Sequence, residues 1–306
     1  KKENIIKFSN LLILSFLTAY LFSIRITGIL ILIQYFVTFV IFLNSENYSI
    51  KKFINNFFLK NLIFLLLLFV FVVFLYPIFW INPLNIIQAI KFMGNFYHDV
   101  CTLTLGKCVK AQDIDSIYIF IWLFFKIPLV IIIGIFLIPF TEKRIFKNSI
   151  NNIYFGTILL SPIIILTILI LNKVPLYDEI RQVMFLVPLI FLLGLISFFF
   201  FSKKISKNVI LVFIFFFIYE NFNMYPYQYT WFNMSARTID LSKNFELEYQ
   251  GISGKELSKK IQNINTPDKK HCIVGASGFI KPYLSQEIYN CYYPFSVLEK
   301  NIERPF

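Results

Sequence analysis

The chain has 306 residues, of which 58% are hydrophobic, and its mean hydropathy is +0.69. A soluble domain of this length needs more polar surface than that, so the composition excludes an ordinary soluble protein. The net charge of +12 does not indicate nucleic acid, because the cations stand mostly in short segments between apolar runs, where membrane orientation explains them better.

Seven apolar segments follow one another along the chain. Runs of about 20 apolar residues cross the roughly 30 Å hydrocarbon core of a bilayer as helices, since backbone groups in lipid must be paired within the chain. We therefore expect an all-α polytopic membrane protein. The expected spans are 11–24, 28–43, 61–80, 117–140, 153–171, 183–201 and 208–220. The first two are short and are interrupted around Arg25 and Gly28, and we favour two spans there over one long broken helix.

The distribution of cations predicts the orientation. The N-terminus and the loops 44–60, 141–152 and 202–207 carry twelve Lys and Arg residues, whereas the loops 81–116 and 172–182 carry five. Loops rich in Lys and Arg stay in the cytoplasm. The loops 81–116 and 172–182 and the tail 221–306 are therefore expected outside it, attached to a transmembrane region at 1–220.

The four cysteines agree with this orientation. Cys101 and Cys108 lie in one outer loop, and Cys272 and Cys291 lie in the tail, where an oxidising compartment permits disulfides. The local pairings are Cys101–Cys108 and Cys272–Cys291, although spacing alone does not fix the connectivity. The spacings do not fit a zinc site.

The tail 221–306 is polar and predicts a small extracytoplasmic α/β domain. Ser253, with Glu256 three residues later, is typical of a capping box that opens a helix. The apolar stretches 272–276 and 288–293 are predicted as strands.

The motifs of common soluble enzymes are missing from the sequence. There is no phosphate-binding glycine loop, no H-E-x-x-H and no C-x-x-C, and the chain has two histidines, His98 and His271. We expect no metal site among these residues and no cofactor, with a divalent metal ion left open as an alternative.

Charges in or near the membrane are the remaining candidates for chemistry. Lys126 stands inside the apolar run 117–140 and Arg25 interrupts the first one; such charges face a cavity or a partner, or else snorkel to the interface. His98 follows a predicted amphipathic helix at 83–97. Asp178 and Arg181 lie with Glu179 in the outer loop 172–182. Cations beside carboxylates at the outer leaflet suit a phosphate-bearing lipid, with ordinary solvated loop charge as the alternative.

Four stretches then give a resemblance. YPIFWINPLNIIQAIKFMGNF at 76–96 looks like a span exit followed by a surface helix. IYIFIWLFFKIPLVIIIGIF at 117–136 has the order Tyr, Trp, Lys, Pro. LYDEIRQVMFLVPLIFLLG at 176–194 has Tyr-Asp-x-x-Arg before Phe and Pro. YPYQYTWFNMSARTIDLSKNFELEYQGISGKEL at 225–257 has a Tyr-x-Tyr-x-x-Phe-Asn element. In this order they resemble the C-terminal part of GT-C-type membrane glycosyltransferases, namely bacterial relatives of the protein O-mannosyltransferases.

The resemblance implies a helical bundle in a bacterial inner membrane. It implies transfer of a sugar from a polyprenyl-phosphate carrier to an unknown glycan, lipid or protein acceptor on the outer face, with no nucleic acid as partner. Lys126, Arg181 and Arg25 would hold the carrier phosphate. The family's catalytic carboxylate follows its first span, which has no counterpart before residue 11, so we expect a fragment and name no catalytic residue. A lipid-linked glycan transporter or flippase and a non-catalytic membrane scaffold remain the alternatives.

Overall fold

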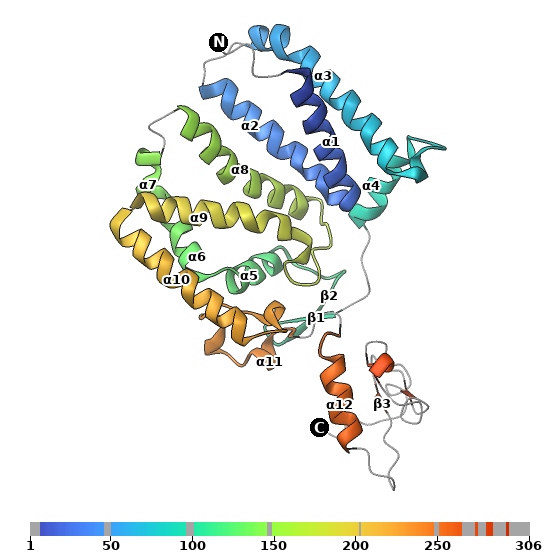
Figure 1. Ribbon diagram of the computed structural model, residues 1–306, viewed down its shortest axis with the longest axis vertical. Coiled ribbons are helices and arrows are strands. Elements are labelled where there is room, and N and C mark those ends of the chain that lie inside the picture. The colour runs from blue at the N-terminus through green and yellow to red at the C-terminus, as the bar shows by residue number, and fades with distance from the viewer. Residues whose placement is uncertain are drawn as a thin grey trace.

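The computed structural model describes residues 7–45, 50–95, 101–145, 149–201, 203–247, 251–264, 273–274, 280–283 and 292–293. Most of these residues are helical. Figure 1 shows helices α1 to α4 on one side of a layered bundle and α5 to α10 on the other, with α12 and β3 apart from them at one end.

The first two helices form an antiparallel hairpin. Helix α1 (Phe8–Ile24) ends at Arg25, a short 3₁₀ turn (Ile26–Leu30) follows, and α2 (Ile31–Ser45) runs back. The hydroxyls of Thr18 and Tyr35 lie 3.2 Å apart, which a continuous helix of this length does not permit. Gly28 is needed in the turn because a Cβ there would lie 2.5 Å from the carbonyl oxygen of Leu21. The region forms two helices, of which the second lies in the candidate span Thr27–Asn44 while α1 is shorter than a span, so the prediction of two spans is confirmed only in part.

Helix α3 (Ile50–Leu75) packs along α1 through a seam of small residues. Ser15 and Ala19 are fully buried, and the Ser15 hydroxyl donates to the carbonyl of Leu11 at 2.7 Å and to that of Phe64 at 3.3 Å. Small residues four apart let membrane helices approach closely. After α3 come a 3₁₀ turn (Pro77–Phe79) and the helix α4 (Asn85–Asn95), which confirms the surface helix predicted at 83–97.

A β-hairpin follows, with β1 (Cys101–Thr104) antiparallel to β2 (Lys107–Lys110). Leu105 and Gly106 form its turn with positive φ angles of 49° and 75°, as a tight hairpin requires. Cys101 and Cys108 form a disulfide with their Cα atoms 5.4 Å apart, which confirms that predicted pairing. Cys272, Cys291 and His98 lie outside the described residues.

The expected span 117–140 is broken into two helices. Helix α5 (Ser116–Lys126) and helix α6 (Leu129–Phe136) meet at an angle of 115°. Pro128 has no N–H to continue the helix, and Ile127 before it is extended, with φ −89° and ψ 135°. The short helix α7 (Ile138–Ile145) follows α6. Helix α5 lies beside the loop 172–182 and the segment after α10, as its contacts below show.

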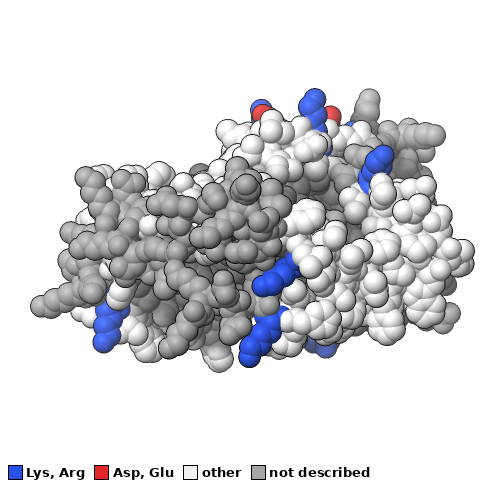
Figure 2. Space-filling view, turned by 90° about the horizontal axis from the view of Figure 1, so that it is seen from above, with Lys and Arg blue, Asp and Glu red and all other residues white. Residues whose placement is uncertain are grey.

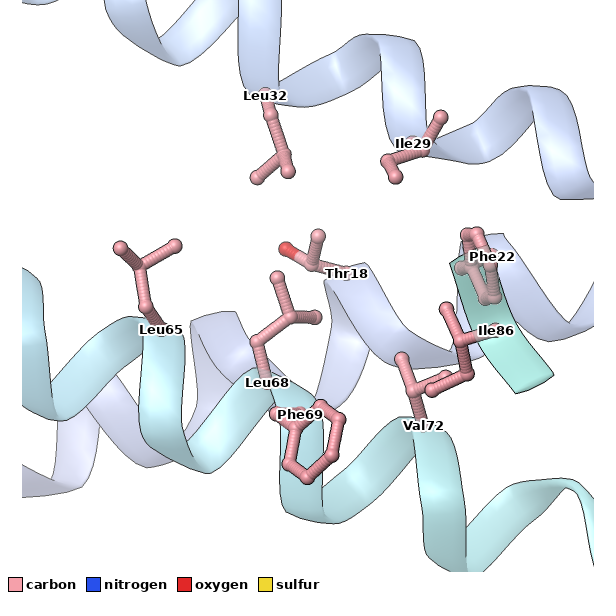
Figure 3. A pocket seen from close by; sticks show the side chains of 9 residues that line it. All are labelled: Thr18, Phe22, Ile29, Leu32, Leu65, Leu68, Phe69, Val72 and Ile86. Atoms are coloured by element: carbon pink, nitrogen blue, oxygen red, sulfur yellow. The ribbon is translucent and has the colours of Figure 1, made fainter. Parts of the chain in front are cut away.

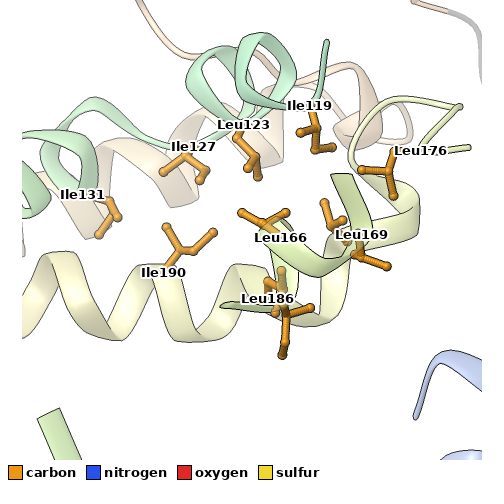
Figure 4. Packing of buried hydrophobic residues seen from close by; sticks show 11 residues of the cluster. Ile119, Leu123, Ile127, Ile131, Leu166, Leu169, Leu176, Leu186 and Ile190 are labelled. Carbon is orange, nitrogen blue, oxygen red and sulfur yellow. The ribbon is translucent and has the colours of Figure 1, made fainter. Parts of the chain in front are cut away.

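Helices α8 (Ser149–Leu171) and α9 (Val187–Phe201) complete the centre of the bundle, with a 3₁₀ turn (Arg181–Leu186) before α9. The core between α5, α6, α8 and α9 is aliphatic (Figure 4). Helices α6 and α9 cross at Gly134 and Gly194, where a Cβ on Gly194 would lie 2.5 Å from the carbonyl oxygen of Ile131. This crossing leaves no room for any side chain.

Helix α10 (Lys203–Asn223) leads into a segment that folds back onto α5. This segment contains the 3₁₀ turns Gln228–Thr230 and Ala236–Thr238 and the helix α11 (Leu241–Asn244). Glu220 holds it to α10 by an ion pair with Arg237 at 2.6 Å and by accepting a hydrogen bond from the Trp231 indole at 2.9 Å. Phe245 pairs with Thr104 of the hairpin in a β-bridge. The segment therefore joins the hairpin, α5 and the end of α10 in one assembly.

The rest of the tail contains a helix and short strands. Helix α12 (Gly254–Ile264) confirms the helix predicted from Ser253 and Glu256. Strands β3 (Ile273–Val274) and β4 (Tyr292–Tyr293) pair in parallel, within the stretches predicted as strands, and a 3₁₀ turn (Lys281–Tyr283) lies between them.

Within the described residues, four helical segments are long and apolar enough to cross a membrane: Thr27–Asn44, Phe58–Leu75, Asn152–Leu171 and Arg181–Phe201. The bent pair of α5 and α6 makes up to five. The prediction of about seven spans is too high by this measure, because α1 has 17 residues and charged or polar residues flank the apolar part of α10. The described residues nevertheless agree with the predicted helical protein that crosses a membrane several times. The face in Figure 2 is mostly uncharged where it is described, with scattered cations.

Candidate functional site

The loop 172–182 and the segment after α10 meet at Lys126, the last residue of α5. Its ammonium lies 2.9 Å from the Glu179 carboxylate, donates to the carbonyl of Tyr229 at 3.0 Å, and stands 4.1 Å from the centre of the Phe232 ring. The side chains of Lys126 and Glu179 are only 6% and 16% exposed. Lys126 therefore joins three segments that are far apart in the sequence, and its side chain is buried between them.

The break beside Lys126 is closed by one side chain. Asn233 donates from its Nδ2 to the carbonyls of Phe124 at 2.6 Å and of Ile127 at 2.8 Å, and its backbone N–H donates to the carbonyl of Phe125 at 2.9 Å. These are the carbonyls left without helical donors by the proline break. Asn233 thus fills the opening that the proline leaves in the helix.

The loop that carries Glu179 has an unusual backbone. Asp178 and Glu179 have positive φ angles of 65° and 60°, which non-glycine residues adopt rarely and which cluster at functional sites. The Glu179 N–H donates to the Tyr118 hydroxyl of α5 at 3.0 Å. Burial raises the pKa of the Glu179 carboxyl, and the Lys126 ammonium partly offsets that rise. The ion pair thus holds this loop against α5, while the cost of removing both charges from water offsets most of its contribution to the stability of the fold.

A second group of charges lies at the N-terminal ends of the spans Thr27–Asn44 and Arg181–Phe201. The Arg25 guanidinium donates from Nη1 to the carbonyl of Arg181 at 3.3 Å and from Nη2 to the side-chain carbonyl of Gln182. The Arg181 guanidinium forms an ion pair with Asp178 at 2.8 Å and keeps 41% of its side chain exposed. Arg25 is also exposed. Two guanidinium-bearing residues, distant in the sequence, therefore stand side by side where solvent or a lipid headgroup reaches them.

The structure brings the sequence candidates together in part. Arg25, Arg181 and Asp178 share one cluster, and Lys126 belongs to the adjoining one through Glu179. Within the described residues, no three His, Cys, Asp or Glu side chains are grouped so that they could hold a metal ion.

Sequence reasoning missed the specific roles of Glu179 and Asn233. The available signal was weak: Glu179 is one of several loop carboxylates, and Asn233 stands in an aromatic segment that is also typical of an interfacial belt. Comparison with protein-family models, with curated proteins and with solved structures finds no match for this chain.

Proposed function

We propose that this chain is a membrane glycosyltransferase of the GT-C type, in which Arg25 and Arg181 hold the phosphate of a polyprenyl-phosphate sugar donor. The observation that carries the proposal is the contact between these two residues at the outer ends of the spans Thr27–Asn44 and Arg181–Phe201. The order of the four sequence stretches described above supports the same reading.

The chemistry of the cluster suits a phosphate. Guanidinium groups bind phosphate oxygens through paired hydrogen bonds, and Asp178 neutralises one of the two charges, so the cluster keeps a net positive charge for an incoming anion. Lys126 is less suited, since its ammonium already contacts Glu179 and Tyr229. A phosphate role for Lys126 stays a prediction that requires Glu179 to move away.

Binding of the phosphate also contributes to the transfer step. When the bond between the sugar and the phosphate breaks, negative charge increases on the departing phosphate oxygen, and fixed guanidinium groups stabilise that charge. A general base would remove the proton from the acceptor hydroxyl. We assign this role to neither Asp178 nor Glu179, because each is held in an ion pair with a neighbouring cation.

The proposal includes a location. The loops 81–116 and 172–182 and the segment after α10 would lie on the outer face of a bacterial inner membrane, as the distribution of cations predicts. The contacts of Tyr118 with Glu179 and of Thr104 with Phe245 support a common side for these three regions.

The test is transfer of labelled sugar from a polyprenyl-phosphate hexose to the membrane fraction of cells that express the full-length protein. Arg25→Gln and Arg181→Gln should each reduce transfer about tenfold to a hundredfold, the loss expected for one charge-assisted hydrogen bond. Lys243→Gln is the matched control, since Lys243 is a largely exposed cation of the outer segment, and it should leave transfer unchanged.

Equal transfer by the wild type and both arginine variants would overturn the phosphate role. If the labelled carrier crosses the membrane without losing its sugar, the protein is a transporter and the proposed transfer is wrong.

A further inference from the structure

The loop 172–182 holds the Arg181 guanidinium through a backbone conformation that is rare for its residues. Asp178 and Glu179 have φ angles of 65° and 60°, in the left-handed region that favours glycine. Two consecutive non-glycine residues keep this conformation only where contacts with the rest of the protein hold it. The Asp178 carboxylate pairs with the Arg181 guanidinium at 2.8 Å, and the Arg181 N–H donates to the Asp178 carbonyl at 3.3 Å. The backbone at 178–179 therefore determines where the guanidinium stands.

The contacts that hold this backbone come from helix α5. The Glu179 N–H donates to the Tyr118 hydroxyl at 3.0 Å, and the Glu179 carboxylate lies 2.9 Å from the Lys126 ammonium. Tyr118 is 2% exposed, and the side chain of Lys126 is 6% exposed. Glu179 is thus held at its backbone and at its side chain by two buried groups of one helix.

Packing fixes the Tyr118 ring. It belongs to an aromatic cluster with Trp122, Phe232 and Phe245, and its centre lies 6.3 Å from that of the Trp122 ring. The Trp122 indole N–H donates to the Thr104 hydroxyl of β1 at 3.1 Å, which joins the cluster to the disulfide-closed hairpin. The Tyr118 hydroxyl therefore accepts from the loop at a position that the protein interior sets.

We infer that Tyr118 and Glu179 are positioning residues for Arg181, which hold its guanidinium beside Arg25 for the phosphate without touching the phosphate themselves. This role rests on the proposed function and extends its exposed site to buried groups of α5. The Arg25 guanidinium donates to the Arg181 carbonyl at 3.3 Å, so a displaced loop would also separate the two arginines. A guanidinium that is already in place loses less freedom when the phosphate binds, and the affinity is higher for that reason.

The experiment is isothermal titration calorimetry of the purified full-length protein in detergent with farnesyl phosphate, which gives the Kd and the number of binding sites separately. Tyr118→Phe keeps the ring and removes the hydroxyl. It should raise the Kd about threefold to tenfold, as expected for the loss of one hydrogen bond, with the number of sites unchanged. A merely structural loss would instead unfold part of the protein, which lowers the number of sites and leaves the Kd of the folded part as it is.

Two controls isolate the effect. Tyr35→Phe also removes a hydroxyl, which lies 3.2 Å from the hydroxyl of Thr18, and it should leave the Kd unchanged. Thr18 lines an apolar cavity of about 150 Å³ between α2 and α3 (Figure 3), and the residues that line this cavity all lie between Thr18 and Ile86 in the sequence. Farnesol lacks the phosphate, so Tyr118→Phe should not change its binding.

Further variants test the path through Arg181. Glu179→Gln keeps the size of the side chain, removes the charge that pairs with Lys126, and should also raise the Kd; it replaces Tyr118→Phe if that variant does not fold. Arg181→Gln should raise the Kd about tenfold to a hundredfold. Adding Tyr118→Phe to Arg181→Gln should change the Kd by less than about twofold, because Tyr118 acts through a guanidinium that is then missing.

The outcomes separate the positioning role from the proposed function. If Arg181→Gln weakens binding but folded Tyr118→Phe and Glu179→Gln bind as tightly as the wild type, the positioning role is wrong and the phosphate site stands. If Tyr118→Phe weakens binding by the same factor with and without the Arg181 guanidinium, Tyr118 acts by another route and the positioning role is wrong. If Arg181→Gln itself leaves the Kd unchanged, the phosphate role in the proposed function is wrong, and the positioning role with it.

Discussion

The ion pair of Lys126 and Glu179 provides the sharpest test of how the loop 172–182 is held against α5. Lys126→Met keeps most of the side-chain volume and removes the charge, which leaves the Glu179 carboxylate buried without its partner. Removing one partner of a buried pair costs about 3–5 kcal/mol, and we expect the lower end because Glu179 is 16% exposed. Glu179→Met should cost a similar amount, since it leaves the Lys126 ammonium nearly buried and unpaired.

The double variant distinguishes pairing from other effects. With both residues replaced by Met, no charge remains buried, and the free energy of unfolding should return to within about 1 kcal/mol of the wild type. The assay is thermal unfolding in detergent micelles. A loss of about 3 kcal/mol in each single variant corresponds to a fall in Tm of about 6–12 °C at the 2–4 °C per kcal/mol typical of larger domains.

One pattern would refute this reasoning. If Lys126→Met unfolds at the wild-type temperature but binds polyprenyl phosphate tenfold or more weakly, Lys126 contacts the carrier and its pairing with Glu179 contributes little. The same result would restore the phosphate role that the sequence alone predicts for Lys126.

Three further predictions follow from single contacts. Asn233→Ala should lower the free energy of unfolding by about 1–3 kcal/mol for each carbonyl left unpaired at the α5–α6 break. Asn172→Ala is the control: it removes one exposed hydrogen bond and should change the free energy of unfolding little. Gly194→Ala should lower the free energy of unfolding by at least about 1–3 kcal/mol, because its Cβ would lie 2.5 Å from the carbonyl oxygen of Ile131. Gly156→Ala is the control and should unfold at a higher temperature, because its Cβ would meet only the flexible Ile41 side chain at 3.1 Å. Non-reducing peptide mapping should find Cys101 linked to Cys108 and Cys272 linked to Cys291. A cysteine engineered at Leu105 should react with a reagent added outside the cell. Free thiols in the mapping, or labelling of residues 44–60 from outside, would contradict the predicted orientation.

The helices of the α1–α3 region were predictable from the sequence because their signals are local. An apolar run long enough to span a bilayer, an interruption at Arg25 and a glycine in the turn are all read within a few residues. The surface helix α4 and the Cys101–Cys108 disulfide are local in the same sense, since each depends on residues within one loop.

The bend at Pro128 was not predictable in the same way. The proline indicates a disturbed helix, but a kinked span and a break of 115° satisfy the local sequence equally. The break is stabilised by Asn233, which follows it by more than a hundred residues, and by the pairing of Lys126 with Glu179. These partners come from two other segments, and no periodicity or motif connects them with α5.

The candidate site likewise combines features that the sequence predicts locally with contacts between distant segments that it does not predict. Arg25 and Arg181 were separately recognisable as cations at the ends of apolar runs. Their contact depends on how the α1–α2 turn meets the start of α9, which is a property of the packed bundle. The sequence therefore predicts the residue types of the site, and the fold determines which of them act together.

The central claim is that a lipid phosphate binds at Arg25 and Arg181. The most direct measurement uses a polyprenyl phosphate with a photoreactive group beside the phosphate, crosslinked to the protein in membranes and mapped by peptide mass spectrometry. A phosphate held by Arg25 and Arg181 should give crosslinks in residues 22–30 and 178–183, reduced in the Arg25→Gln and Arg181→Gln variants. Crosslinks confined to residues 44–60 or 202–207, at the opposite ends of the spans, would contradict the proposed site.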